Sequence, residues 1–265
     1  MSDRIELPLA GTPFGASPSF VDLVRREHPE AMPSGTGEVP FAVPHGTTVL
    51  GLKFAGGILM AGDRRATAGN IIADAKMRKV FAADDYSAIA IAGVAGQAAE
   101  LVKLFQLELE HYEKITGDRL SLEGKANRLA QMIRSNFPLA MQGLVVVPLF
   151  GGFDERKDEG RIFYYDATGG RWEEDDYQTT GSGGQSAKNS LKKRWRRGLA
   201  ADEALRVAVE ALIDAAEDDS ATGGPDVARR IWPIVVRVTA EGASDVPEDD
   251  VVAAVDAVLQ ERSGT

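Results

Sequence analysis

The chain of 265 residues contains no cysteine and only three histidines, His28, His45 and His111. The absence of cysteine excludes disulfide bonds, thiolate zinc sites, iron–sulfur clusters and every mechanism with a cysteine nucleophile. The scarcity of histidine argues against a Ser-His-Asp triad, and neither an HExxH motif nor the acidic order of a calcium-binding loop occurs. We therefore expect no bound metal and no cofactor.

Positive charge and long apolar runs are also scarce. The sequence contains 30 Lys and Arg residues and 40 Asp and Glu residues. The net charge of −10 disfavours binding to nucleic acid or anionic membranes. The apolar run at residues 144–150 is far shorter than the ~18–20 residues of a membrane-spanning helix, and the N-terminus lacks the apolar core of a signal peptide. We expect a soluble cytoplasmic protein, and we interpret the basic segment 188–197 as a solvated or subunit-contacting face.

Proline is unevenly distributed, with seven of the 12 prolines in the first 46 residues. This predicts an extension with little regular structure, apart from a short amphipathic stretch at residues 20–26. Beyond it, apolar patterns predict strands at 47–54, 57–61, 88–92, 144–150, 161–166 and 231–238, with 172–179 as a weaker candidate. They predict helices at 97–116, 122–137, 186–196, 201–219 and 248–262. Grouped strands and paired helices favour antiparallel sheets covered by helices. Pro148 indicates a bulge or an edge strand.

The boundary between the extension and the first strand carries a chemical signal. Gly46 is followed at once by Thr47 and Thr48, which open the strand. Cleavage after Gly46 would make Thr47 a new N-terminus. A free α-amine, with a pKa of ~7.7–8.0, can act as the base for the hydroxyl group of its own residue. A hydrolase without a catalytic histidine or cysteine is therefore chemically feasible.

Four short motifs stand in register with this boundary: TTVLG at 47–51, GDRRAT at 62–67, MRKV at 77–80 and AGVAG at 92–96. Asp63, Lys79 and Gly93 follow Thr47 by 16, 32 and 46 residues. In these motifs and spacings the chain resembles the β subunits of the 20S proteasome, in their actinobacterial form with a long propeptide. The resemblance covers residues 47–265.

The resemblance implies an α+β fold, the four-layer αββα sandwich of Ntn-hydrolases, in which two antiparallel sheets lie between helix layers. It implies that residues 1–46 are a propeptide and that residues 47–265 are the catalytic domain of a threonine endopeptidase. The implied partners are heptameric rings of this β subunit stacked with heptameric rings of α subunits. Two further partners are implied: an ATPase ring, which acts through the α rings, and unfolded or tagged protein substrates.

The resemblance also assigns roles to single residues. Thr47 would be nucleophile and base, Lys79 would lie beside its hydroxyl group, and Asp63 would pair with Lys79. The Gly93 N–H would stabilise the oxyanion, and Thr67 with Gly93 would pair with an extended substrate. The pocket for the residue before the cut would be formed by five apolar residues: Ala66, Met77, Phe81, Ile91 and Ala95.

Two further residues, Ser182 and Asp219, match the family's serine and aspartate near the terminal amine. Asp219 is preferred to the adjacent Asp218 because this choice aligns Thr222 with a serine of the family. The family commonly has Ser-Gly-Gly where this chain has threonine followed by two glycines at 222–224, so a hydroxyl group is retained.

Two alternatives remain open. A noncatalytic ring subunit would build the chamber only, but such subunits usually lose the threonine or the lysine. A two-ring bacterial ATP-dependent threonine protease also begins Thr-Thr, but its chain is shorter and typically lacks so long a propeptide.

Overall fold

The computed structural model describes residues 46–264. The amphipathic stretch predicted at residues 20–26 lies outside this range. The strands are β1 (Thr48–Phe54), β2 (Gly57–Gly62), β3 (Ala66–Ala68), β4 (Ile71–Asp74), β5 (Val80–Asp84), β6 (Ser87–Gly93), β7 (Val146–Asp154), β8 (Glu159–Tyr165), β9 (Arg171–Glu174), β10 (Tyr177–Gly181), β11 (Ile234–Thr239) and β12 (Gly242–Asp245). The helices are α2 (Ala95–Thr116), α3 (Leu122–Ser135), α4 (Phe137–Ala140), α5 (Gly184–Arg194), α6 (Ala201–Asp218) and α7 (Glu248–Ser263).

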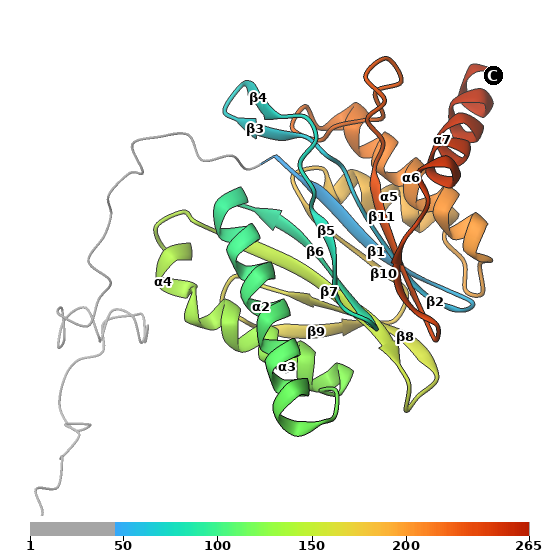
Figure 1. Ribbon diagram of the computed structural model, residues 1–265. Helices are drawn as coiled ribbons and strands as arrows, with labels where there is room; N and C mark the ends of the chain where they lie inside the picture. Colours follow the sequence, from blue (N-terminus) through green and yellow to red (C-terminus); the bar gives the residue numbers. More distant parts are fainter. Residues whose placement is uncertain (1–45, 265) are drawn as a thin grey trace, which may run out of the picture. The chain divides into compact units, whose positions relative to one another are not determined.

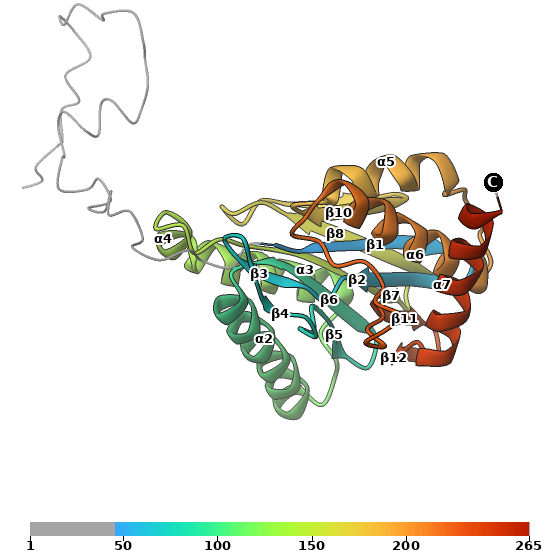
Figure 2. The ribbon, with the colours of Figure 1, turned by 90° about the horizontal axis from the view of Figure 1, so that it is seen from above.

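These elements form four layers (Figures 1 and 2). One five-stranded antiparallel sheet has the order β10-β1-β2-β11-β12, and the other has the order β5-β6-β7-β8-β9. Helices α2 and α3 cover the second sheet, whereas α5 and α6 pack on the first sheet and α7 packs on α6. The predicted α+β sandwich of two antiparallel sheets between helix layers is therefore confirmed.

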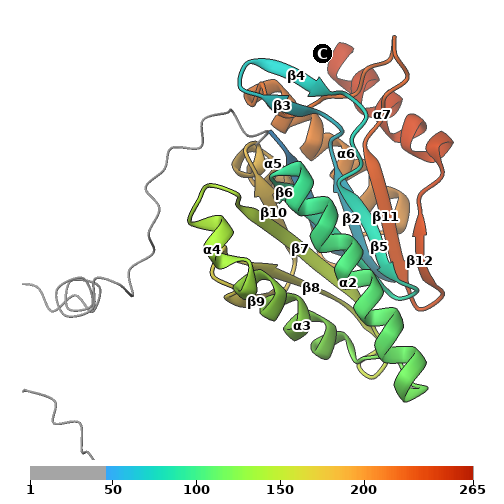
Figure 3. The same cartoon turned by 60° about the vertical axis from the view of Figure 1, so that its left-hand side comes forward.

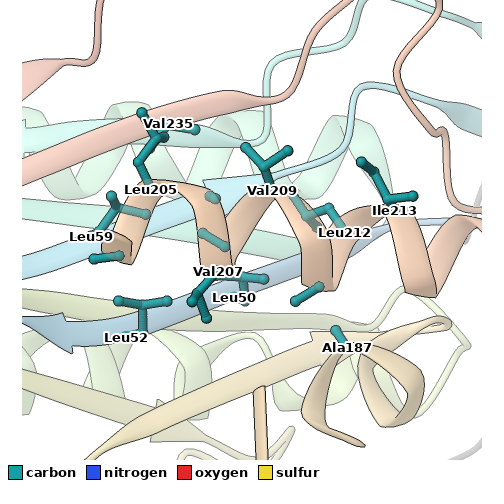
Figure 4. Packing of buried hydrophobic residues seen from close by; sticks show 14 of the residues in the cluster. Leu50, Leu52, Leu59, Ala187, Leu205, Val207, Val209, Leu212, Ile213 and Val235 are labelled. Atoms are coloured by element: carbon teal, nitrogen blue, oxygen red, sulfur yellow. The ribbon is translucent and has the colours of Figure 1, made fainter. Parts of the chain in front are cut away.

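The layers are held together by alternation along the strands. In β1, Val49 faces the opposite sheet and belongs to the apolar cluster between the sheets, together with Ile58, Met60 and Ile162. The next residue, Leu50, faces the helices instead. It packs with Leu59 of β2, with Leu205 and Leu212 of α6, and with other apolar residues of α5, α6 and α7 (Figure 4). A third cluster, centred on Phe105, Phe150 and Phe163, joins α2 and α3 to the second sheet. Both faces of each sheet are thus buried, which fixes the register of the strands.

Three details differ from the sequence predictions. The weak candidate strand at 172–179 is two strands, β9 and β10, which belong to different sheets. The chain bends between them at Asp175 and Asp176, where adjacent carboxylates suit a strand poorly. Short strands β3, β4, β5 and β12 were not predicted from apolar patterns.

Pro148 lies in β7, which is a central strand, so the expected edge position is wrong. The residue pairs with Ile91 of β6, but the pairing of β7 with β8 begins only at Leu149. At Pro148, the edge of β7 that faces β8 is therefore not paired. A central strand accommodates proline here because no N–H group is required on that side.

None of the helices in residues 46–264 is long and apolar enough to cross a membrane.

Candidate active site

The start of β1 and the end of β2 meet at one end of the sandwich, where Val49 pairs with Gly62. The peptide bond between Gly46 and Thr47 is enclosed at this point, and Thr47 is only 4% exposed. The Thr47 carbonyl oxygen accepts a hydrogen bond of 2.8 Å from the Ser182 N–H. The Thr47 N–H donates to Ser182 Oγ at 3.3 Å. The loop after β10 therefore holds the residue that opens β1.

Asp63 directly follows β2 and is completely buried. Its Oδ1 accepts hydrogen bonds from the Thr48 N–H at 2.8 Å and from Lys79 Nζ at 2.7 Å. Its Oδ2 accepts from the N–H groups of Arg65 at 2.8 Å and Gly223 at 2.9 Å. Four donors from separate segments offset the cost of burying this carboxylate.

Lys79 is 3% exposed, and its Nζ has three oxygen partners. Besides Asp63, these are the carbonyl oxygens of Arg65 at 2.5 Å and Gly46 at 3.4 Å. Burial lowers the pKa of Lys79 below its usual value of 10.5, the charge and hydrogen bond of Asp63 oppose this, and the positive charge of Arg65 adds to the lowering. The contact with Gly46 places the ammonium group on the bond that precedes Thr47.

A chain of hydroxyl groups connects this region to Asp219. The Gly183 N–H donates to Thr48 Oγ1 at 2.9 Å, and Thr48 Oγ1 lies 2.7 Å from Thr222 Oγ1. Thr222 and Ser182 both donate to Asp219 Oδ2, at 2.6 and 2.5 Å. Burial by itself raises the pKa of Asp219, but the hydrogen bonds from Ser182, Thr222 and the Ala221 N–H, together with the charge of Lys79, outweigh it and leave the pKa below its usual value.

The structure thereby distinguishes the two adjacent aspartates at the end of α6. Asp219 accepts a hydrogen bond from Ser182, whereas Asp218 accepts one from Ser186. Thr222 is fully buried, and its hydroxyl group, which replaces that of the family's serine, donates to Asp219.

Gly46 occupies a space that no side chain can share. A Cβ atom at this position would lie 2.4 Å from Thr67 Oγ1 and 2.7 Å from the Ala221 carbonyl oxygen. Real Cβ atoms do not approach neighbours so closely, so the backbone would have to shift. Thr67 of β3 and the loop before Thr222 therefore clamp the residue that precedes Thr47.

Gly93 ends β6 in a left-handed conformation, with φ of 123°. A Cβ atom there would lie 2.1 Å from the Val145 carbonyl oxygen, so glycine is required. The end of β6 is tied to the lysine segment because the Ile91 N–H donates to the Lys79 carbonyl oxygen at 2.9 Å.

The five predicted pocket residues lie on five different elements or loops. Phe81 of β5 and Ile91 of β6 pack in the apolar cluster beneath α2, and Ala95 is the first residue of that helix. Ala66 begins β3 and is buried, while the Met77 N–H donates to the Arg64 carbonyl oxygen.

Sequence reasoning missed the contributions of Thr48, Arg65, Gly183 and Gly223. Thr48 joins the hydroxyl chain, and the other three act through backbone groups. Backbone donors leave no residue-type signal, so only the fold could reveal them. Within residues 46–264, no cluster of three or more His, Asp or Glu side chains could hold a metal ion. The expectation that no metal or cofactor is needed remains a prediction.

Comparison with known proteins bears on this arrangement. The family model described as "Proteasome subunit" matches residues 43–228. The chain is 54% identical over 260 residues to "Proteasome subunit beta" of Streptomyces griseus subsp. griseus, covering 97% of this chain and 92% of the relative. It is 51% identical over 263 residues to "Proteasome subunit beta" of Acidimicrobium ferrooxidans, covering 98% and 96%. By the family match and by these near full-length similarities, the chain belongs to the proteasome subunit family.

Proposed function

We propose that this chain is a catalytic β subunit of a 20S proteasome core and acts as a threonine endopeptidase in the cytoplasm. Thr47 is the nucleophile, and it is released when the subunit cleaves its own Gly46–Thr47 bond. The observation that carries the proposal is the enclosure of this bond: Thr47 Oγ1 lies 2.5 Å from the Gly46 carbonyl oxygen, and Lys79 Nζ lies 3.4 Å from the same oxygen.

Self-cleavage uses the groups around this bond. Thr47 Oγ adds to the Gly46 carbonyl carbon, and Lys79 stabilises the negative charge that develops on the carbonyl oxygen. The bond from that carbon to the Thr47 nitrogen then breaks, and the hydroxyl proton passes to the nitrogen. Ser182 Oγ, 3.3 Å from this nitrogen, is placed to transfer the proton. Water hydrolyses the resulting ester, which leaves a carboxylate on Gly46 and both a free amine and a hydroxyl group on Thr47.

The same groups serve peptide hydrolysis. The Thr47 amine takes the proton of its own hydroxyl group, and the Lys79 ammonium both disfavours protonation of the amine and favours the alkoxide. Asp63 keeps Lys79 oriented, while Ser182 and Asp219 hold the amine. The Gly93 N–H stabilises the oxyanion of the substrate, and Thr67 with Gly93 pairs with the substrate backbone.

The fit of Gly46 supports the proposed boundary between a propeptide, residues 1–46, and a catalytic domain, residues 47–265. Gly46 permits the close approach of Thr67 and Ala221 around the bond to be cut. A noncatalytic ring subunit has no need of this enclosure, nor of a buried lysine in contact with it.

Intact-mass measurement of assembled particles tests the proposal. We expect the mature subunit to begin at Thr47, and we expect Thr47→Ala particles to assemble with the propeptide attached and to have no peptidase activity. Lys193→Ala, in the basic segment of α5, is the control and should leave both processing and activity intact. Fully active wild-type particles that retain residues 1–46, or an active and pure Thr47→Ala particle, would contradict the proposal.

Substrate preference follows from the proposed pocket of Ala66, Met77, Phe81, Ile91 and Ala95, whose side chains are all apolar. Desolvating a charged side chain there is costly, so we expect cleavage after apolar and aromatic residues. Fluorogenic peptides that differ only in the residue before the cut measure this preference. Fastest cleavage after Arg or Asp would contradict it.

For assembly, we propose homo-heptameric β rings stacked with heptameric α rings, an ATPase ring that acts through the α rings, and unfolded or tagged protein substrates. The support is the high identity to relatives named "Proteasome subunit beta" over nearly their full length. That length also disfavours the shorter two-ring bacterial protease.

A further inference from the structure

A small cavity adjoins Asp63, between the β3–β4 hairpin and the loop that connects α6 to β11. The hairpin stands at the upper end of the sandwich in Figure 3. The cavity has a volume of about 40 Å³, and the polar residues among its lining are Arg64, Arg65, Asp226, Arg229 and Trp232. This volume is enough for a few atoms the size of water or for one small ion.

Two residues that line this cavity each carry a buried donor without an acceptor. Arg64 Nε and Trp232 Nε1 are buried and have no hydrogen-bond partner within residues 46–264. Trp232 is 7% exposed, so bulk water does not reach most of its side chain. Guanidinium and indole groups can only donate hydrogen bonds, and an unsatisfied buried donor destabilises the fold. These two donors therefore require a hydrogen-bond acceptor.

Charge narrows the choice of acceptor. Three arginines line the cavity, and Asp226 is the single acidic residue among the lining residues. Asp226 is already engaged by Arg229, through the Arg229 N–H at 2.9 Å and through Arg229 Nε at 3.7 Å. Water would satisfy donors but would leave the excess positive charge. An oxyanion supplies several acceptor oxygens together with the missing negative charge.

The cavity is continuous with the groups that hold the active site. Arg65 and Gly223 both line the cavity and both donate their N–H groups to Asp63 Oδ2. The Arg65 carbonyl oxygen accepts from Lys79 Nζ, and Arg65 Nη1 donates to the Ser220 carbonyl oxygen at 2.9 Å. A ligand in the cavity would therefore join the hairpin side to the loop that carries Thr222.

We propose that this cavity binds one small oxyanion, of the size and chemistry of inorganic phosphate, and that the bound ion stabilises the packing of residues 63–65 against the loop at 219–233. Arg64, Arg65, Arg229 and the Trp232 indole N–H are its donors. Binding does not depend on catalysis, so the site exists whether or not Thr47 is the nucleophile.

Thermal unfolding of the assembled particle tests this site. Phosphate is titrated at constant ionic strength into the wild type, into Trp232→Phe, which keeps an aromatic ring but removes the indole N–H with the smaller ring, and into Arg229→Gln. Arg229 is 69% exposed, so this second variant should fold even if Trp232→Phe does not. Arg197→Gln, at an arginine that is 86% exposed and outside the cavity, is the matched control.

We expect a saturable rise in the unfolding temperature of the wild type, because a ligand that binds only the folded state stabilises it. Each cavity variant should require about tenfold more phosphate for the same rise, and Arg197→Gln should match the wild type. A response without saturation, an unchanged response in Trp232→Phe and Arg229→Gln, or an equal loss in Arg197→Gln overturns the proposal. The catalytically silent Thr47→Ala particle should respond as the wild type does, which separates this test from that of the proposed activity.

Discussion

Two buried lysine–aspartate pairs lie in this domain, and they differ in what surrounds them. Lys79 pairs with Asp63 at 2.7 Å, and Lys125 of α3 pairs with Asp84 of β5 at 2.5 Å. Both lysine side chains are about equally buried, at 3% and 5% exposed. By burial and pairing alone, the two would be assigned the same role.

Their other contacts separate them. Asp84 accepts further hydrogen bonds from the Tyr86 N–H and from Ser87 Oγ, both within the adjoining turn, so its contacts are local. Asp63 instead joins distant segments of the chain, and Lys79 also contacts the Gly46 carbonyl oxygen. The two pairs thus differ in one respect: only Lys79 contacts the bond that we propose to be cleaved.

The largest effect should follow from Lys79→Met, which keeps the apolar part of the side chain but removes the charge. We expect a loss of at least about 10³-fold in kcat, together with retention of the propeptide, because an oxyanion contact and the group that tunes the Thr47 amine are both lost. Peptide hydrolysis and intact mass measure the two outcomes. Normal removal of the propeptide in Lys79→Met would show that Lys79, like Lys125, has only a structural role.

Lys125→Met is the matched change in the other pair. It leaves the buried Asp84 carboxylate without its cationic partner and with only two local hydrogen-bond donors. We therefore expect the free energy of unfolding to fall by about 3 kcal/mol. The kcat of particles that assemble should stay within about twofold of the wild type. Chemical denaturation and peptide hydrolysis, measured on the same preparation, distinguish the two effects. A large loss of kcat at full stability would break the comparison.

Alkaline pH should also separate activity from stability. Because the pKa of folded Lys79 lies below 10.5, kcat should fall as pH rises through that lowered value. Between the folded and unfolded pKa values the unfolded chain binds more protons, so the contribution of Lys79 to the free energy of unfolding rises with pH. Activity and unfolding followed in parallel check the sign. A kcat that stays constant up to pH 10.5 would contradict the lowered pKa.

The smallest effects concern Thr222. Thr222→Val preserves the shape but removes the hydroxyl group that donates to Asp219. Loss of a hydrogen bond to a charged group costs at least about 1.5 kcal/mol, which corresponds to a roughly tenfold lower kcat/KM. Thr222→Ser keeps the hydroxyl group and should stay within about twofold. Equal activity of the Val and Ser variants would show that the hydroxyl chain does not position the site.

Much of this molecule could be predicted from sequence because its patterns are strong. The alternating apolar residues of β1 and the helical face of α2 placed both elements to within about two residues. The motif spacing grouped Thr47, Asp63 and Lys79 into one site, and the fold brings them together there. Each of these features depends on residue type at a defined interval.

The remainder depends on contacts that residue types do not encode. The break between β9 and β10 follows from the passage of the chain between two sheets, and the place of Pro148 follows from where the β8 ladder stops. The N–H groups of Arg65 and Gly223 act on Asp63 through the backbone. The pattern of a single chain contains no record of such pairings.

The contacts that organise Thr47 span most of the domain. They join residues 135 positions apart for Thr47 and Ser182, 160 for Asp63 and Gly223, and 174 for Thr48 and Thr222. Contacts of such high sequence separation form late, since long loops must close before they are made. A nascent chain that has not yet left the ribosome beyond Thr222 lacks the Thr222 hydroxyl group and the Gly223 N–H. The topology therefore places the proposed self-cleavage after synthesis of the chain up to Gly223, because these contacts cannot form earlier.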